Sequence, residues 1–266
     1  MRQDCFHVKG EILDRVTQAD HLLVCLDFDG TLTPFRDNPS LVTLSATMRR
    51  ALESLNSHAN VSLAIISGRE RADLFQRVKI PGVIYVGNHG LEISGPGFIF
   101  IEPIAASSRP ALQAVATDLG QRLQHIPGVL LEDKGLTLTV HYRQVAQKHG
   151  EDVRNAVHAA LANSPHPFQL TSGAKIYEIR PRTYWNKGTA LLCLIEHLGQ
   201  LNPLTIYMGD DDTDEDAFAA LPDGLTIKIG DSSNTQANYQ LDSPAEVQSF
   251  LEWLNRILRQ QPSLVP

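Results

Sequence analysis

The sequence predicts an α/β fold: a Rossmann-like core of parallel strands with an inserted α+β cap domain. Short apolar runs that end in Gly, Asp or Ser alternate with segments of helical spacing, which is the pattern of βαβ units. From about residue 102 to residue 172 the order changes to helix, strand, strand, helix, strand. We therefore assign residues 1–102 and 179–266 to the core and residues 103–178 to the cap.

The composition is that of a folded, acidic protein. The 266 residues, 42% hydrophobic and 20% charged, suffice for one large domain or for a domain with an insertion. Lys and Arg number 23 against 30 Asp and Glu, a net charge of −7 with no basic run, so we expect no nucleic-acid partner. No window reaches the roughly 18 apolar residues of a membrane span, so we expect no membrane partner.

We expect the protein to be cytoplasmic. Residues 1–20 carry several charged side chains and no long apolar stretch, so we expect no signal peptide. The three cysteines, Cys5, Cys25 and Cys193, have neither the number nor the spacing of a disulfide framework or a zinc site. A reducing compartment is the simpler interpretation.

The core elements follow in order along the chain. Uninterrupted apolar runs predict buried strands at 22–26, 61–66 and 83–86, and again at 204–208 and 225–229. Apolar residues at helical spacing predict a helix over 44–55 and another that ends near residue 78. Residues 91–101 are expected to form a hairpin that turns at Gly95-Pro96-Gly97.

One strand of the insertion shows a clear alternation. Leu136, Leu138, Val140 and Tyr142 alternate with the polar residues Thr137, Thr139, His141 and Arg143. This alternation predicts a strand with one buried face and one solvent-exposed face. We expect the insertion to lie over the carboxyl ends of the core strands, where open α/β sheets bind ligands.

Two aspartates follow the first core strand directly. The period of two places Asp27 and Asp29 on one face, with Phe28 on the other. Repulsion between the carboxylates would raise one pKa unless a cation lay between them, so a divalent metal is their natural partner. In such a site Asp27 can attack phosphorus while Asp29 acts as acid and then as base. The alternative is a strand-ending turn with a helix cap.

Polar residues also follow the neighbouring elements. Ser67 can donate its hydroxyl to a phosphate oxygen, and Gly68 allows the backbone to approach closely, although Ser-Gly is also a common turn. Lys187 opens the helix that runs to residue 198, where a cation opposes the helix dipole. A phosphate partner would explain that charge, and the alternative is a solvated surface lysine.

Residues 209–216 contain six acids in eight positions. Such a run repels itself unless some members bind metal or cap the following helix. A calcium loop of the EF-hand kind is disfavoured, because its later glycine and its final glutamate are absent. Magnesium prefers one or two carboxylates with water and phosphate, which Asp27, Asp29 and Asp210 could supply. Asp211 and Asp214 would then position Lys187 or metal-bound water.

These four segments, in this order, resemble the motifs of the haloacid dehalogenase-like phosphatases, and the place of the insertion resembles members with a C2-type cap. Further segments resemble the trehalose-6-phosphate phosphatase family: residues 87–92, 132–135, 141–143, 173–181, 186–188 and 209–216. The resemblance implies magnesium-dependent hydrolysis of trehalose 6-phosphate through an aspartyl-phosphate. It implies the catalytic residues Asp27, Asp29, Ser67, Lys187 and Asp214 and the metal ligands Asp27, Asp29 and Asp210.

A sugar substrate fits the polar residues of the insertion. Lys175 and Glu178 bring a donor and an acceptor suited to hydroxyls, but the parity of a strand places them on opposite faces unless a bulge intervenes. Arg69 and His89 could instead brace Glu92, and Lys134 could be only a turn lysine. The expected substrate-binding residues are Gly68, Arg69, Asn88, His89, Lys134, His141, Arg143, Lys175 and Glu178.

Three alternatives stay open. The chain could hydrolyse another sugar phosphate, such as a sucrose, glucosyl glycerate or mannosyl glycerate phosphate, with the same core residues. It could be a non-catalytic sugar-phosphate-binding regulator of a synthase, although such a protein has no chemical need for all four of Asp27, Asp29, Lys187 and Asp210. It could be a phosphomutase. A trehalose-6-phosphate synthase is a further partner to consider.

Overall fold

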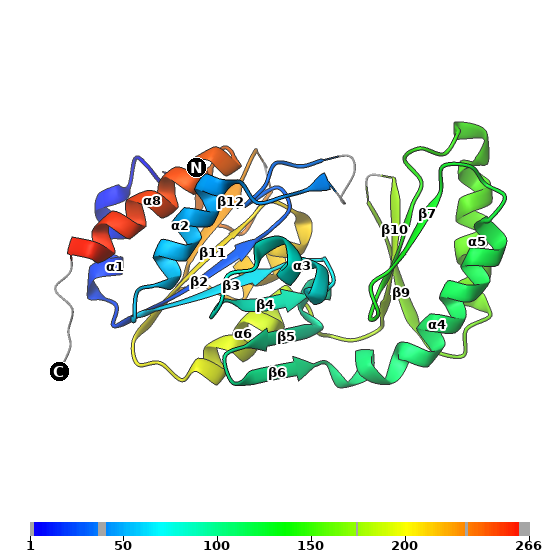
Figure 1. Cartoon of the computed structure of the whole chain (residues 1–266), viewed down its shortest axis with the longest axis horizontal. Helices are drawn as coiled ribbons and strands as arrows, with labels where there is room; N and C mark the ends of the chain where they lie inside the picture. Colours follow the sequence, from blue (N-terminus) through cyan, green and yellow to red (C-terminus); the bar gives the residue numbers. More distant parts are fainter. Residues whose placement is uncertain (1–2, 37–40, 174, 232–233, 261–266) are drawn as a thin grey trace. The chain divides into compact units, whose positions relative to one another are not determined.

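The computed structural model describes residues 3–36, 41–173, 175–231 and 234–260. The chain divides into two compact units (Figure 1). The first, here called the core unit, comprises Met1–Phe100 and Trp185–Pro266, and the second, the insertion unit, comprises Ile101–Tyr184.

Among the described residues the core unit contains a sheet of nine strands, in the order β1-β13-β12-β11-β2-β3-β4-β5-β6. Neighbouring strands from β1 to β4 are parallel, and β5 is antiparallel to β4. The predicted core strands and the hairpin are confirmed. The strands are β1 (Gln3–Asp4), β2 (His21–Asp27), β3 (Val61–Ile66), β4 (Ile84–Gly87), β5 (Glu92–Gly95), β6 (Phe98–Ile101), β11 (Pro203–Gly209), β12 (Leu225–Ile229) and β13 (Tyr239–Leu241).

Helices cover both faces of this sheet (Figure 1). Apolar side chains of α1, α2, α3 and α8 pack into one cluster with the sheet, and those of α6 and α7 pack into a second cluster. The predicted helices at 44–55 and ending near 78 are confirmed. The elements are α1 (Lys9–Gln18), α2 (Ala46–Asn56), α3 (Arg71–Val78), η2 (Asn88–Gly90), α6 (Lys187–Leu198), η4 (Asp212–Asp214), α7 (Glu215–Ala219) and α8 (Pro244–Gln260).

Within the described part of the insertion unit, an antiparallel sheet of order β7-β8-β10-β9 packs with two long helices. Leu138, Val140 and Ile179 lie in one apolar cluster with residues of both helices. Because β10 reaches Pro181 as a strand of this sheet, the unit extends beyond residue 178. Its elements are α4 (Pro103–Leu123), β7 (Leu130–Asp133), β8 (Leu138–His141), η3 (Gln147–His149), α5 (Gly150–Ala162), β9 (Phe168–Gly173) and β10 (Ile176–Pro181).

The predicted exposed face is wrong at two positions, one just before β8 and one within it. Thr137 and Thr139 are 0% and 2% exposed. The register places Glu132 of β7 and Glu178 of β10 directly beside Thr139, on the same face of the sheet. Long side chains on both neighbouring strands flank the short threonine, so polarity alone did not indicate exposure.

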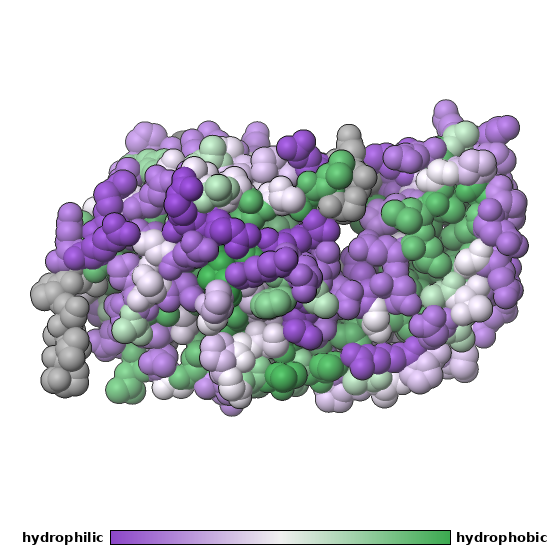
Figure 2. Space-filling model, in the orientation of Figure 1, coloured by the Kyte–Doolittle hydropathy of each residue, from purple (hydrophilic) through white to green (hydrophobic). Residues whose placement is uncertain are grey.

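Hydrophilic residues cover most of the surface that Figure 2 shows. Large apolar side chains such as Ile99 and Leu201 are also exposed, which is normal for single residues. No helix among the described residues combines the length and the apolar character that crossing a membrane requires.

Candidate active site

The parallel strands bring polar residues to one edge of the core sheet. Strand β2 ends at Asp27, strand β3 is followed by Ser67, and strand β11 is followed by Asp210. The register pairs Asp27 with the last residue of β3, and Leu26 with Met208 near the end of β11. These side chains therefore meet at the carboxyl edge, as expected from the positions of the apolar runs.

Lys187 lies between two of the carboxylates. Its ammonium group donates to Asp27 Oδ1 at 2.9 Å and to Asp214 Oδ1 at 2.7 Å, and it lies 3.8 Å from Asp211 Oδ1. The side chain is 1% exposed. Burial by itself would lower the pKa of Lys187, but the three carboxylates raise it well above its ordinary value. Lys187 therefore stays charged.

The local sequence explains why helix α6 begins at Lys187. The side chain of Asn186 accepts from the backbone N–H of Thr189, and the hydroxyl of Thr189 accepts from the N–H of Asn186. This reciprocal cap fixes the first turn. A Cβ atom on Gly188 would lie 2.3 Å from the carbonyl oxygen of Asp216, so only glycine permits this approach to the acidic segment.

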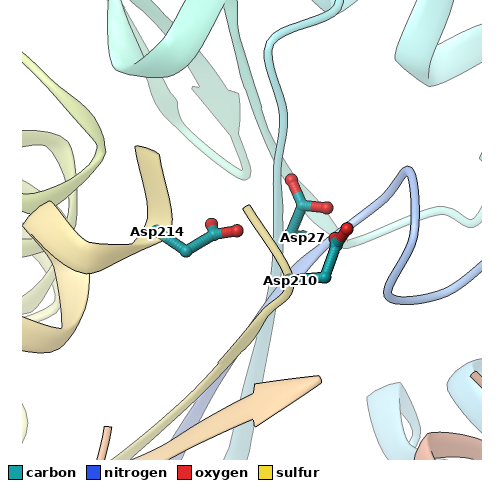
Figure 3. A group of neighbouring side chains, drawn as sticks. All are labelled: Asp27, Asp210 and Asp214. Carbon is teal, nitrogen blue, oxygen red and sulfur yellow. The ribbon is translucent and has the colours of Figure 1, made fainter. Parts of the chain in front are cut away.

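Three carboxylates could hold a metal ion. Asp27, Asp210 and Asp214 each offer an oxygen within 4.8 Å of the others, and Figure 3 shows the three side chains close together. Thr31 Oγ1 donates to Asp210 Oδ1 at 3.0 Å. Gly30 makes room for this carboxylate, because a Cβ atom there would lie 2.0 Å from Asp210 Oδ2.

The electrostatics of this group favour a bound cation. Burial raises the pKa of Asp27 well above its ordinary value, Lys187 opposes this effect, and the neighbouring carboxylates add to it. Burial and the charges of Asp214 and Asp211 raise the pKa of Asp210 to about 6. A divalent cation would reverse both shifts, and carboxylate oxygens are the ligands that Mg²⁺ prefers. The donor set therefore fits magnesium.

Asp214 is held by the protein itself. Its Oδ1 accepts from Lys187 at 2.7 Å and from the hydroxyl of Tyr207 at 2.7 Å, and its Oδ2 accepts from the N–H of Asp211 at 3.0 Å. We did not predict Tyr207 from the sequence, because it stands within an apolar strand. The available signal was its spacing of two from Gly209, which places it on the face of the sheet that α6 covers.

The carboxylate of Asp29 lies outside the group of three and against Arg69. The guanidinium donates to both of its oxygens, at 2.6 and 2.7 Å, and also donates to Asp73 at 2.9 Å. Its carbon lies 5.6 Å from the centre of the Phe28 ring. The structure places Arg69 on the expected acid–base residue, and its contact with substrate stays a prediction.

Ser67 and Gly68 lie against the turn that follows β4. Ser67 is 1% exposed, and its Oγ accepts from the N–H of Arg69 at 3.2 Å. The N–H of His89 donates to the Ser67 carbonyl at 2.9 Å. A Cβ atom on Gly68 would lie 2.4 Å from the His89 ring, so the missing side chain permits this contact.

The turn that carries Asn88 and His89 has an unusual backbone. Both residues have positive φ, 49° and 57°, a conformation that favours glycine and asparagine. The Asn88 amide donates to Glu92 Oε1 at 2.7 Å, and the N–H of Arg71 donates to the same oxygen at 2.9 Å. Asn88 and Arg71 therefore provide the bracing of Glu92 that we considered for Arg69 and His89.

Three of the expected residues of the insertion unit, Lys134, His141 and Glu178, lie in two polar groups. Glu178 is 6% exposed, accepts from Arg180 Nε at 2.9 Å and lies 3.7 Å from Lys134 Nζ. His141 Nε2 lies 2.8 Å from Glu132 Oε2. Glu132 and Arg180 lie in segments that resemble the family, but we gave neither a role, because the strand register that brings them to His141 and Glu178 could not be predicted from local spacing.

Lys175 and Arg143 lie beyond the strand ends. β9 ends at Gly173 and β10 begins at Ile176, so Lys175 lies in the hairpin turn, with φ at 65°. The expected strand parity between Lys175 and Glu178 therefore does not apply. The Lys175 ammonium lies 5.6 Å from the centre of the Tyr142 ring, and Arg143 is exposed after β8.

The sequence matches one protein-family model and several known proteins with related names. The model of the family described as "Trehalose-phosphatase" matches residues 25–245. A trehalose-phosphate phosphatase from Mycobacterium tuberculosis is 39% identical over 249 residues, which are 90% of this chain and 62% of that protein. The chain thus spans about three fifths of the length of this relative.

Solved structures share the fold. The C-terminal domain of a trehalose-6-phosphate phosphatase from C. albicans superposes with a TM-score of 0.79 at 23% identity, covering 96% of this chain and 98% of that one. A haloacid dehalogenase-like hydrolase from Bacteroides thetaiotaomicron gives 0.62 at 17% identity, covering 89% and 99%. The predicted fold class is confirmed.

Proposed function

Since the chain belongs to the trehalose-phosphatase family, we propose that it hydrolyses trehalose 6-phosphate to trehalose and inorganic phosphate. The observation that carries this proposal is the contact of Lys187 with Asp27 and Asp214, at 2.9 and 2.7 Å, beside Asp210. A buried lysine that stays charged beside a buried carboxylate suits the binding of a phosphate ester next to a nucleophile.

In the first step Asp27 attacks phosphorus. Lys187 holds Oδ1 of Asp27, so the second oxygen forms the new bond to phosphorus. The bond between phosphorus and the sugar oxygen breaks, and Asp29 gives its proton to that oxygen. An aspartyl-phosphate and the free sugar result. The hydroxyl of Ser67 and the ammonium of Lys187 would hold phosphate oxygens during the transfer.

In the second step a water molecule replaces the enzyme oxygen. Asp29, now ionised, takes a proton from the water, whose oxygen attacks the phosphorus of the aspartyl-phosphate. The bond from phosphorus to Asp27 breaks, which releases inorganic phosphate and restores the carboxylate. Asp214 and Tyr207 keep Lys187 in place through both steps.

Asp27 and Asp210, with the backbone carbonyl of Asp29, would hold magnesium. When bound, the ion would neutralise charge on the carboxylates and on the transferring phosphoryl group. The oxygens of Asp214 accept hydrogen bonds from Lys187, from Tyr207 and from the backbone N–H of Asp211, so we assign it to positioning rather than to the metal. This leaves two carboxylates for the ion, which suits the preference of Mg²⁺ for retained water.

We also propose that the insertion unit acts as the cap that recognises the sugar. One face of its sheet carries two polar groups: the pair Glu132 and His141, and the group of Lys134, Glu178 and Arg180. Charged donors and acceptors at fixed distances suit a substrate with many hydroxyls. Gly68, Asn88 and His89 of the core unit would contribute at the phosphate end.

A phosphatase for another sugar phosphate is the second candidate, because the core residues would serve any phosphate monoester. A non-catalytic regulator is less well supported. Binding alone does not require a nucleophile and an acid–base residue, so a regulator would have no chemical need for Asp27, Asp29, Lys187 and Asp210 together. Burying the charges of Asp27 and Lys187 also costs several kcal/mol unless they are matched. Association with a trehalose-6-phosphate synthase is a further proposal.

The test is phosphate release from a panel of disaccharide phosphates, with magnesium and with a chelator. We expect trehalose 6-phosphate to be the best substrate, activity to disappear with chelator, and Asp27→Asn to lose at least about 10³-fold in kcat. Asp14→Asn, an exposed aspartate of α1, is the matched control. Near wild-type turnover in Asp27→Asn would remove Asp27 from the role of nucleophile.

A further inference from the structure

Lys228 is a buried charged residue that the proposed reaction does not use. It lies on β12, and its side chain is 5% exposed. Its ammonium donates to the carbonyl of Asp210 at 2.6 Å and to that of Asp211 at 3.5 Å, and it lies 3.9 Å from Glu215 Oε1. Burying an ammonium group costs several kcal/mol unless its contacts compensate. All three of these contacts go to the acidic segment 210–215.

The strand register explains this position. Lys228 pairs with Gly209, the last residue of β11, and Thr226 pairs with Tyr207. Because side chains alternate along a strand, Lys228 lies on the same face of the sheet as Tyr207 and two residues nearer the carboxyl edge. The ammonium group therefore lies where the chain leaves the sheet to form the acidic segment.

The contacts of Lys228 restrict the backbone that carries Asp210. The peptide group is planar, so a carbonyl bound to Lys228 fixes the orientation of the whole Asp210–Asp211 peptide. The carboxylate of Asp210 is fixed separately by Thr31, at 3.0 Å. Asp210 is thus held from both ends, by a cation at its carbonyl and by a hydroxyl at its side chain.

The partner of Lys228 at the far end of the segment is itself anchored. Glu215 Oε1 accepts from Thr235 Oγ1 at 2.5 Å, and Oε2 accepts from the N–H of Gln236 at 2.7 Å. Lys228 thus holds the start of the acidic segment, and Glu215 ties its end to Thr235 and Gln236. The positive charge also offsets repulsion among the six acids of 209–216.

We propose that Lys228 is a positioning residue of the metal site: it sets the affinity for magnesium through the backbone of Asp210, without touching the ion. The inference rests on the proposed function, which assigns Asp210 as a ligand. Lys187 differs in that it contacts the nucleophile and would contact phosphate. Removing Lys228 therefore affects metal binding first, whereas removing Lys187 affects phosphoryl transfer.

The test measures Mg²⁺ binding directly, by isothermal titration of the full chain with magnesium chloride and no substrate. Loss of a group that orients a metal ligand typically weakens binding by about 10- to 100-fold, so Lys228→Met should raise the Kd for Mg²⁺ about tenfold or more. Lys228→Arg keeps the charge and donors and should recover part of this loss. Lys148→Met, at an exposed lysine, should leave the Kd unchanged.

Kinetics give a second readout that a purely structural role would not produce. At saturating Mg²⁺ the Lys228→Met protein should have the wild-type KM for the phosphate ester, while the magnesium concentration for half-maximal activity rises in parallel with the Kd. An unchanged Kd for Mg²⁺ in Lys228→Met, with only a lower melting temperature, would overturn the inference.

Two further outcomes are decisive. Should the methionine variant not fold, as judged by circular dichroism, Lys228→Gln replaces it: the glutamine side chain is uncharged and one atom shorter than lysine, so it should lose the contact with the Asp210 carbonyl and also raise the Kd. A Kd equal to wild type in that variant overturns the inference. If the wild-type chain itself binds no Mg²⁺, the proposed metal dependence fails and this inference fails with it. If the wild type binds and Lys228→Met binds equally well, only the inference fails.

Discussion

The carboxylate of Asp29 is clamped by Arg69, which donates from Nε to one oxygen at 2.6 Å and from Nη2 to the other at 2.7 Å. The third nitrogen, Nη1, donates to Asp73 at 2.9 Å. A guanidinium fork of this kind fixes both the position and the plane of a carboxylate. To transfer a proton, Asp29 has to exchange part of this contact for one with the sugar oxygen or with water.

Replacing Arg69 by lysine should therefore impair proton transfer more than binding. A lysine keeps the charge but cannot hold both oxygens of Asp29. Acid–base catalysis contributes roughly 10²- to 10⁴-fold, so we expect kcat for the sugar phosphate to fall about tenfold or more, with a smaller change in KM. The leaving group of p-nitrophenyl phosphate needs no proton. With this substrate the variant should therefore still release p-nitrophenol in the first turnover as fast as the wild type does.

The control is Arg122→Lys, at an arginine that pairs with Asp118 one turn away on a surface of α4. It should have wild-type kinetics with both substrates. Equal loss of the first turnover with the sugar phosphate and with p-nitrophenyl phosphate would show that Arg69 does not act through proton donation by Asp29.

Removing the ammonium of Lys187 should strongly destabilise the metal-free protein. Asp27 and Asp214 would then face each other without a cation, and breaking a buried ion pair costs about 3–5 kcal/mol. We expect Lys187→Met to lose about this much free energy of unfolding in urea at pH 7 with chelator. Adding Asp27→Asn should restore part of it. A double variant no more stable than the single one would contradict this account.

The strand ends could be predicted from the sequence because each apolar run stops at a polar residue. Asp27, Ser67 and Asp210 all follow such runs, and the carboxyl ends of parallel strands meet at one edge. The pairing of Asp29 with Arg69 could not be predicted. The two residues lie 40 positions apart, and only tertiary packing brings a guanidinium to that carboxylate rather than to a substrate.

Other contacts were missed for different physical reasons. Tyr207 and Lys228 each stand within a strand, between two apolar residues. The local sequence therefore did not indicate that they hydrogen-bond to the acidic segment. Lys175 has a positive φ that its residue type does not indicate. We therefore applied the parity of one strand to Lys175 and Glu178, whereas β10 begins only at Ile176 and Lys175 precedes it in the turn.

Replacing Tyr207 by phenylalanine should cost about 1–2 kcal/mol of stability. The change removes one of the hydrogen bonds to Asp214 and leaves a buried carboxylate with a missing donor. Tyr239→Phe is the matched control, because that hydroxyl donates at the same 2.7 Å distance to Glu11 in a partly buried setting, and we expect a smaller loss. Urea unfolding at pH 7 measures both, and equal losses would contradict a special role for Tyr207.

The raised pKa of Asp210 makes both stability and metal binding depend on pH. Burial and neighbouring carboxylates raise this pKa to about 6, against about 4 in the unfolded chain. The folded state therefore prefers the protonated form. Its contribution to stability is fully present below pH 4, and the metal-free protein loses it as the pH rises from about 4 to about 6.

Magnesium binding should show the opposite trend, because a metal ligand has to be ionised. Below pH 6 each unit of acidification should raise the apparent Kd for Mg²⁺ about tenfold, whereas above pH 7 the Kd should level off. The increase in melting temperature that magnesium produces should accordingly shrink from pH 7 to pH 5. Titration calorimetry across this range is the direct measurement. Equal affinity at pH 5 and pH 7 would mean that Asp210 either is not a ligand or does not have the raised pKa that its burial implies.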